Sequence, residues 1–440
     1  MGEKRKKTTK RASLAAVTEM MARSEGGKEK DLSILLQGGT PDGEQRLLAM
    51  GGSPAFIPRK DGRLGVLTNA RGRGVSDDGG RTFASLAAIN VPEPPAKSTE
   101  RVQGGHAGFN GGAGYVKMAR GKIGMTWTQT YPVGGNQDVF RFMFRSSEDD
   151  GETWSEDVRV NIGEDKGAPL FGTLRQLSTG RLIQPVRWLH WGGPQLRKMS
   201  VCTCKGEVLD HEGHGHHPEL EIAYCYYSDD EGKTWSRSIG DVIGWFQDGW
   251  GNFITIDEPC VEELPEGRLL MISRSLVGRL LASFSEDGGT TWSIPEVTAL
   301  SADGAPCMMR RLPETGDVLC VWNQQSASEI RRGLRRCRLT AALTSDGKTW
   351  SHFRSIEWHA HVAERSEYIA PEEGRVQLIR ALDDVGELPA GYGSSSYPTI
   401  DVVGDEVFIA YGHTIGRHPK HMIGAHKYRI LPVEWFYAGG

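Results

Sequence analysis

The chain has 440 residues, a formal net charge of −4 and 38% hydrophobic residues. This near-neutral balance argues against nucleic acid as a general partner, because proteins that bind nucleic acid carry a marked excess of Lys and Arg. No apolar run approaches the roughly 20 residues that cross a bilayer, so we expect no membrane association.

The first thirty residues differ from the rest in composition. They are rich in Lys, Arg, Glu, Ser and Gly, with a basic stretch from Lys4 to Arg11. We therefore expect residues 1–30 to form a disordered or weakly helical basic tail. The following Ala-Ser-Leu-Ala-Ala-Val segment is too short for the apolar region of a secretory signal, which favours a cytoplasmic protein.

A short pattern, Ser-x-Asp-x-Gly-x-Thr-Trp, recurs five times. The copies are Ser76–Phe83, Ser147–Trp154, Ser228–Trp235, Ser285–Trp292 and the shorter Thr344–Trp350. Each predicts a tight β-hairpin, because the Asp carboxylate accepts backbone N–H bonds and the Gly adopts a positive φ. The aromatic ring is expected to be buried against the neighbouring sheet, where its loss would cost roughly 3–5 kcal/mol.

The sequence around each copy repeats as well. A strand, a Gly-containing turn and a second apolar strand precede the hairpin, and a sixth unit has the two strands without the hairpin. These units cover residues 55–64, 114–123, 174–182, 260–270, 308–318 and 397–407. Six repeats of four short antiparallel strands predict an all-β fold, a six-bladed β-propeller over residues 31–440. We expect a strand near Leu32–Leu36 to complete the last blade.

The seven cysteines are odd in number and mostly fall in predicted strands, which indicates buried thiols. One cluster stands apart in a glycine-rich insertion and consists of Cys202, Cys204, His211, His214, His216 and His217. Its spacing matches no standard zinc site, so a surface loop is the simpler interpretation. We expect neither a metal nor a cofactor.

Propellers bind ligands where their innermost strands converge, and two such strands carry polar residues suited to chemistry. Glu258 opens one inner strand and Arg274 ends the next, so a hairpin brings both to the same rim. Tyr397 opens the last blade among small residues. Glu258 and Arg274 would also fit a structural ion pair, and Tyr397 a plug in the channel.

The chain resembles the sialidase (neuraminidase) superfamily of six-bladed propellers, whose hairpin motifs are called Asp boxes. The likeness runs from Ser53 to Tyr428 and includes the motif Glu-Pro-x-x-x-Glu-Leu-x-x-Gly-Arg-Leu-Leu-x-x-x-Arg from Glu258 to Arg274. The resemblance implies that Tyr397 is a nucleophile activated by Glu258. It also implies that Arg274 binds a substrate carboxylate.

The resemblance also implies two further arginines and an acid/base. Arg336 matches the second carboxylate-binding arginine, although its neighbours Arg331, Arg332, Arg335 and Arg338 compete for that role. The Arg-Ile-Pro motif that supplies the third arginine is replaced by Gly-Ser-Pro-Ala at residues 52–55. Arg71 or Arg73 would compensate. Asp138 is the expected acid/base aspartate.

The chemistry agrees with these residue types. A sugar derived from a 2-keto acid carries a carboxylate on its anomeric carbon, which repels an anionic nucleophile and favours a neutral tyrosine. Arginine donates two parallel hydrogen bonds to such a carboxylate. The expected function is therefore a retaining exo-glycosidase acting on a terminal acidic sugar.

Two other functions stay open at this level. One is a non-catalytic carbohydrate-binding or scaffold propeller. The other is a polysaccharide lyase in which Tyr397 acts with His106 or His190. In each case the expected partner is a carbohydrate, and the sequence does not indicate the oligomeric state.

Overall fold

The computed structural model describes residues 32–92, 109–110, 113–134, 137–163, 165–189, 203–204, 207–208, 221–246, 252–254, 256–275, 277–331, 334–359, 362, 367–372, 392–416 and 423–438. The expected tail over residues 1–30, His106, His190 and nearly all of the Cys/His-rich insertion lie outside these ranges. Statements about absence below refer only to the described part.

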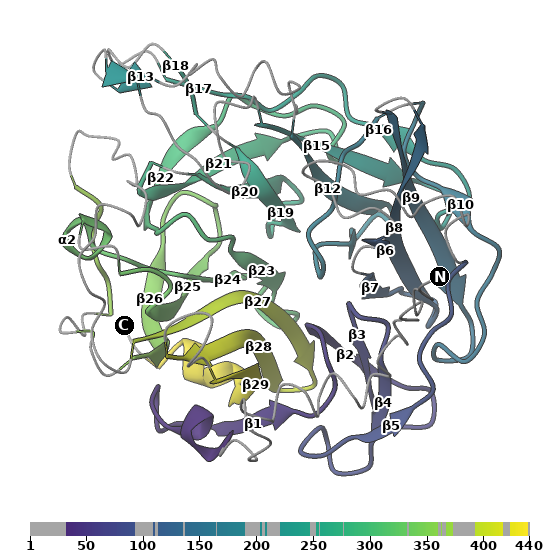
Figure 1. The fold of residues 1–440 in the computed structure, drawn as a ribbon, viewed down its shortest axis with the longest axis horizontal. Helices are drawn as coiled ribbons and strands as arrows, with labels where there is room; N and C mark the ends of the chain where they lie inside the picture. The colour runs from purple at the N-terminus through teal and green to yellow at the C-terminus, as the bar shows by residue number, and fades with distance from the viewer. Residues whose placement is uncertain are drawn as a thin grey trace, which may run out of the picture.

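Six antiparallel sheets surround a central axis as the blades of a propeller, which confirms the predicted fold (Figure 1). Blade 1 contains β2 (Pro54–Pro58), β3 (Leu64–Thr68), β4 (Arg73–Ser76) and β5 (Ala84–Leu86), and blade 2 contains β6 (Phe109–Asn110), β7 (Gly114–Lys117), β8 (Ile123–Gly134), β9 (Gln137–Ser147) and β10 (Val158–Arg159). Blade 3 contains β11 (Arg175–Gln176), β12 (Leu182–Leu189), β15 (Glu221–Ser228) and β16 (Ser236–Arg237), and blade 4 contains β19 (Asp257–Glu263), β20 (Leu269–Arg274), β21 (Arg279–Ser285) and β22 (Glu296–Ser301). Blade 5 contains β23 (Met308–Arg311), β24 (Val318–Trp322), β25 (Arg338–Thr344) and β26 (Ser351–Trp358), and blade 6 contains β27 (Gly393–Val403), β28 (Glu406–Ile415), β29 (Ile423–Pro432) and β1 (Glu44–Leu48).

Little other regular structure accompanies the blades. Two short ribbons pair β13 (Thr203–Cys204) with β14 (Glu207–Val208) and β17 (Gly244–Phe246) with β18 (Asn252–Ile254). The helical segments are η1 (Leu32–Leu36), α2 (Ala327–Arg331) and η4 (Val433–Phe436). Among the described residues, no helix is long and apolar enough to span a membrane.

The two ends of the described chain meet in blade 6. β1 forms the outermost strand there and pairs antiparallel with β29 from Glu44↔Ile430 to Leu48↔His426. The expected closure by an N-terminal strand is therefore confirmed, but its position near Leu32–Leu36 was wrong, because that segment is the 3-10 helix η1. An outermost strand is half-exposed and partly polar, whereas apolarity made the buried segment around Leu35 stand out.

Each repeated motif forms the predicted turn between the third and fourth strands of its blade. In blade 2, the Thr153 backbone N–H and hydroxyl donate to Asp149 at 2.8 and 2.6 Å, and the Gly151 N–H donates to Ser147 Oγ at 2.8 Å. Hydrogen bonds of the same kind hold the other four turns. The aspartates are thus fully engaged within their own hairpins.

The glycine and aromatic residues that recur in these turns also contact neighbouring blades. Gly232 has φ 89°, and a Cβ there would lie 2.0 Å from the Phe144 ring of the preceding blade, so only glycine fits. Trp235 then packs against Phe144 in a tilted arrangement, with ring centroids 5.4 Å apart. Trp154 likewise packs into the cluster between blades 1 and 2, but both rings are half-buried rather than buried as expected.

Ion pairs, one buried and one half-buried, connect the innermost strands around the axis. Arg175 of blade 3 pairs with Glu262 of blade 4 at 2.8 Å. Arg310 of blade 5 pairs with Asp401 of blade 6 at 2.9 Å, and Asp401 also accepts the Phe56 N–H of blade 1 at 2.8 Å. These contacts join neighbouring blades, including the first and the last in the sequence, and so hold the blades in a fixed order around the axis.

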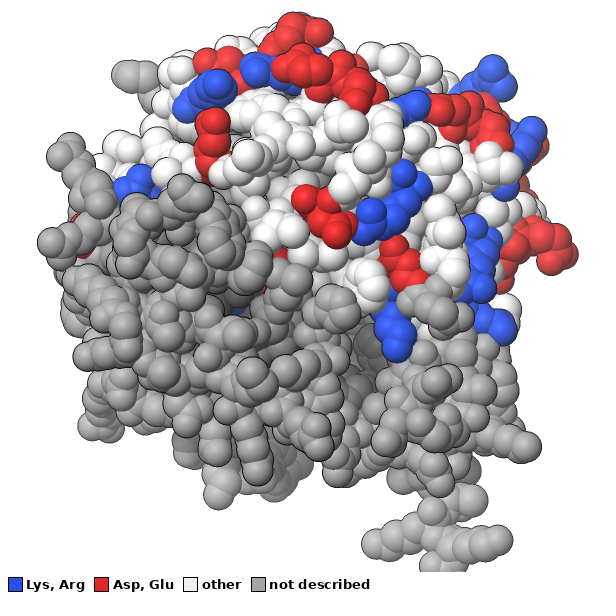
Figure 2. Space-filling view, turned by 90° about the horizontal axis from the view of Figure 1, so that it is seen from above, with Lys and Arg blue, Asp and Glu red and all other residues white. Residues whose placement is uncertain are grey.

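The alternation of strand direction separates the two faces of the propeller. The turn between first and second strands and the motif turn lie on one face, while the ends of the second strands and the starts of the first strands lie on the other. In the edge-on view of Figure 2, the face at the top carries Lys, Arg, Asp and Glu intermingled, without a large area of one sign. Ion pairs such as Arg81–Glu406 and Arg181–Asp229 join motif turns to the turns between first and second strands.

We expect Trp154→Ala to lower the free energy of unfolding by about 2–3 kcal/mol, less than for a fully buried tryptophan, because the ring is half-buried. Urea unfolding monitored by circular dichroism measures this. Ile294→Ala is the matched control, since Ile294 is 77% exposed and its change should stay within about 0.5 kcal/mol. An equal loss in both variants would contradict the proposed inter-blade packing.

Acid should destabilise the propeller in two stages. Burial, aided by Lys427 and Arg429, lowers the pKa of His413 to about 3, so folding favours the neutral imidazole and loses stability as pH falls below about 6.5. In Asp149 and Asp230, burial alone would raise the pKa, but the hydrogen bonds of the turn outweigh it and lower the pKa to about 2. Their contribution is complete above about pH 4 and is lost toward pH 2. Calorimetry at pH 7, 5 and 3 should show a falling Tm, and a constant Tm would refute this.

Candidate functional site

Two irregular strands create the centre of the site. The pairing of β19 with β20 shifts between Asp257 and Cys260, and Glu258 inside this bulge has φ 44°. The pairing of β27 with β28 shifts between Ser396 and Thr399, and Tyr397 inside that bulge has φ 56°. Both residues precede a proline, which has no N–H for the ladder. Bulges of this kind re-aim side chains next to functional sites.

The two bulges bring the predicted tyrosine and glutamate together. The Tyr397 hydroxyl donates to Glu258 Oε1 at 3.0 Å, although 138 residues separate the two in sequence order and blades 4 and 6 carry them. Glu258 Oε2 contacts Arg274 Nη1 at 2.6 Å. Glu258 and Arg274 are only 8% and 7% exposed, so this pair lies in a medium where charge is costly. The Phe171 ring packs beside Tyr397, with the two ring centroids 6.1 Å apart.

Arg336 is the arginine of its cluster that faces Tyr397. Its guanidinium carbon lies 5.1 Å from the centre of the tyrosine ring, and Nη1 donates to Ser396 Oγ at 3.3 Å. Arg336 has φ 54°, and the buried Asp303 accepts its backbone N–H. Arg338, a competing candidate, instead forms a buried pair with Glu329 at 3.0 Å.

The surroundings keep the tyrosine protonated. Burial raises the pKa of Tyr397, the negative charge of Glu258 raises it further, and Arg336 and Arg274 offset part of this effect. Burial works against the charge of Arg274, but Glu258 and Asp257 outweigh it and raise the pKa of the guanidinium. A neutral phenol therefore contacts a carboxylate that can accept its proton, and two cations act on it from nearby.

Three further charged residues extend the cluster and were missed from the sequence. Asp257 lies 3.4 Å from Arg274 and 2.9 Å from Arg187 of β12, which in turn lies 3.5 Å from Glu221 of β15. Asp257 could have been found as the neighbour of Glu258. Arg187 and Glu221 could not, since they belong to another blade and to no motif.

The remaining predicted residues, Asp138 and Arg71, belong to blades 2 and 1, and their roles stay predictions. Asp138 lies on β9, paired with Pro132 near the ends of both strands, and its side chain lies outside the described residues. Arg71, with φ 66°, occupies the turn between β3 and β4, and its charge acts on Tyr115 of blade 2. The part of the chain described here contains no group of three metal-ligating side chains.

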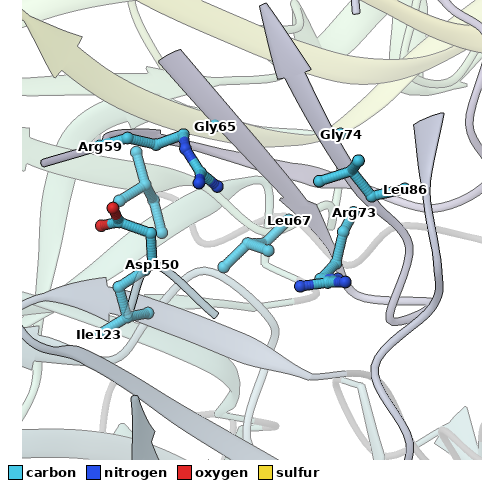
Figure 3. A pocket seen from close by; sticks show the side chains of 9 residues that line it. Arg59, Gly65, Leu67, Arg73, Gly74, Leu86, Ile123 and Asp150 are labelled. Atoms are coloured by element: carbon cyan, nitrogen blue, oxygen red, sulfur yellow. The ribbon is translucent and has the colours of Figure 1, made fainter. Parts of the chain in front are cut away.

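Arg73, the alternative to Arg71, belongs to a crevice between blades 1 and 2. Figure 3 shows Arg73 and Arg59 with Asp150 around this crevice. Arg73 Nη1 donates to Gly151 O at 2.8 Å and to Glu152 at 2.9 Å. Asp150 accepts the Lys60 N–H at 3.0 Å. These charges are paired within the protein, so the crevice has a structural role.

The described cysteines agree with the expectation of buried thiols. They are free and buried: Cys225, Cys260, Cys307, Cys320 and Cys337.

Solved structures share this architecture at low sequence identity. A protein of unknown function from Dyadobacter fermentans superposes with a TM-score of 0.53 at 15% identity, covering 88% of this chain and 98% of that one. The NanB sialidase of Streptococcus pneumoniae gives 0.53 at 12% identity, covering 90% and 70%. The Trypanosoma rangeli sialidase gives a TM-score of 0.51 at 14% identity. That superposition covers 90% of this chain but only 56% of the enzyme. These likenesses concern the fold.

No curated protein sequence matches the chain. A family model, however, described as the BNR repeat-like domain, matches residues 115–409. This match runs from the first strand of blade 2 into the second strand of blade 6 and includes Glu258, Arg274, Arg336 and Tyr397. With well over half of its residues in that match and a six-bladed propeller like those of sialidases, the chain belongs to the BNR repeat-like domain family.

Proposed function

We propose that this protein is a sialidase-like retaining exo-glycosidase that hydrolyses the bond to a terminal acidic sugar. The observation that carries the proposal is the 3.0 Å hydrogen bond from Tyr397 to Glu258, formed by two residues held at positive φ in separate bulges. Backbone strain at two contacting polar residues is typical of functional sites. A purely structural tyrosine would not require it.

In the proposed reaction, Tyr397 Oη attacks the anomeric carbon while Glu258 accepts the phenolic proton. The glycosidic bond breaks, and Asp138 is the proposed donor of the proton that the leaving oxygen takes. Water then attacks the glycosyl–tyrosine bond, gives its proton to the same acid/base group and releases the sugar. The returning phenol regains its proton from Glu258. Two displacements at one carbon retain the configuration.

The two cations suit a substrate with a carboxylate beside the reacting carbon. The Arg336 guanidinium lies 5.1 Å from the centre of the Tyr397 ring, and the positive charge of Arg274 also acts on Tyr397. Their positive charge would bind the carboxylate and stabilise the tyrosinate that forms during attack. The proposal therefore narrows the expected carbohydrate partner to a sugar that carries a carboxylate beside its anomeric carbon.

A second function is favoured by one observation. The Arg274–Glu258 pair at 2.6 Å satisfies both charges without a ligand, as a non-catalytic carbohydrate-binding propeller would allow. Hydrolysis of aryl glycosides of several acidic sugars, both 2-keto acid sugars and uronic acids, distinguishes the two. Release of the aryl alcohol with retained configuration supports the enzyme, and binding of these sugars without release supports the binding module.

Tyr397→Phe should abolish turnover and leave substrate affinity nearly unchanged, because it removes the attacking oxygen and keeps the ring. Steady-state kinetics and calorimetric binding of the same glycoside measure the two effects. Tyr437→Phe is the matched control, since Tyr437 also donates its hydroxyl to a carboxylate, Asp317 at 2.9 Å, in a turn of the opposite face. Full activity of Tyr397→Phe would exclude this mechanism.

Arg274→Ala should weaken binding by about 2–5 kcal/mol, because it leaves the substrate carboxylate and Glu258 without their cation. Arg274→Lys should restore only part of the affinity, since an ammonium cannot form the bidentate fork. Arg145→Ala removes a comparable ion pair, Arg145–Asp157 at 2.7 Å in blade 2, and should leave affinity unchanged. Unchanged affinity in Arg274→Ala would mean that the ligand has no carboxylate at this position.

A further inference from the structure

The bulge in β19 directs two consecutive carboxylates to one guanidinium. Successive side chains of a regular strand point to opposite faces. Here the φ of 44° at Glu258 breaks that alternation, and Arg274 Nη1 contacts both Glu258 at 2.6 Å and Asp257 at 3.4 Å. The charge of Arg274 is therefore divided between the proposed base and its sequence neighbour.

Asp257 is an unusual buried carboxylate. It is 1% exposed, and neither of its oxygens accepts an aligned hydrogen bond from the described residues, although two guanidinium groups lie within ion-pair distance. A buried charge held by Coulomb attraction alone contributes little to stability, because desolvation offsets the attraction. Its retention beside Glu258 requires another explanation.

Arg187 completes the arrangement from blade 3. Its Nε lies 2.9 Å from Asp257, and its Nη1 lies 3.5 Å from Glu221. Burial and the nearby Asp257 raise the pKa of Glu221 well above its usual value. Arg187 lies closer to Asp257 than to Glu221, so Arg187, Asp257, Arg274 and Glu258 form a cluster of two cationic and two acidic side chains.

We propose that Asp257 and Arg187 are positioning residues that set how far Arg274 neutralises Glu258. Asp257 attracts Arg274 away from Glu258, and Arg187 limits that attraction by neutralising Asp257 from the other side. This inference rests on the proposed roles of Tyr397 and Glu258. Blade 3, through Arg187, would then influence the proton transfer between Tyr397 and Glu258.

The proposal predicts opposite effects of two neutral substitutions on the pKa of Tyr397. Asp257→Asn leaves Arg274 wholly to Glu258 and removes a negative charge, so the pKa of Tyr397 should fall. Arg187→Gln leaves Asp257 uncompensated, draws Arg274 from Glu258 and should raise that pKa. Each change should be on the order of 0.5 at low salt. The other groups that face Tyr397, namely Arg336 and Phe171, stay the same.

The test uses the full chain with its 11 tyrosines replaced by 3,5-difluorotyrosine, whose phenol titrates near neutral pH. Fluorine NMR follows each titration, and the signal absent from Tyr397→Phe identifies Tyr397. Arg145→Gln is the matched control and should leave this titration unchanged, as its partner is Asp157 of blade 2. Shifts of opposite sign in Asp257→Asn and Arg187→Gln support the proposal.

Shifts of the same sign, or no shift, would overturn it. Asp257→Asn is nearly isosteric and should fold. If Arg187→Gln fails to fold, the titration of Tyr397 in Asp257→Asn alone tests the proposal. The titration needs no substrate and does not depend on the proposed glycosidase activity. If hydrolysis is found, both substitutions should lower kcat by roughly tenfold or more with a smaller effect on KM, because they act on proton transfer. Absence of hydrolysis with opposite shifts would remove the proposed function and keep the coupling.

Discussion

The ion pairs between innermost strands fix the geometry on which the rest of the molecule depends. Arg175–Glu262 and Arg310–Asp401 join blades 3 to 4 and 5 to 6, and Asp401 extends the connection to blade 1. Burial raises the pKa of Asp401 despite Arg310, which indicates that desolvation outweighs the attraction. Such pairs favour one arrangement of the blades more than they add net stability. That arrangement places the starting ends of the first strands side by side.

At those ends the backbone is held away from its preferred conformation. Glu258, Arg336 and Tyr397 all have positive φ, which costs on the order of 1–3 kcal/mol at each non-glycine residue. The propeller tolerates the strain at Glu258 and Tyr397 because the remaining length of their strands pairs regularly. Arg336 lies two residues before β25, which pairs regularly with β24. The result is a tyrosine, a carboxylate and two arginines directed to one point from blades 4, 5 and 6.

The site couples its charges through a single arginine. Arg274 contacts the proposed base and also Asp257, which Arg187 neutralises in turn. In a buried cluster each of these charges acts strongly on its neighbours, because little water screens them. The proton affinity of the Tyr397–Glu258 pair is therefore a property of the whole cluster, to which blades 3, 4 and 6 contribute, and a substrate carboxylate at Arg274 would change it.

The sequence by itself determined the architecture and indicated the residues of the candidate site. Local chemistry specifies the five motif turns, and the strand pairs before them, with a sixth pair that has no motif, predicted six blades. Glu258, Arg274 and Tyr397 were proposed from strand ends and one motif. Tertiary structure alone decided what depends on contacts between blades. It placed the closing strand at Glu44–Leu48, because an outer strand has no strong apolar pattern. It placed Arg336 rather than Arg338 beside Tyr397, and it brought Arg187 into the charged cluster. The distance between residues on different blades cannot be read from the sequence of either segment.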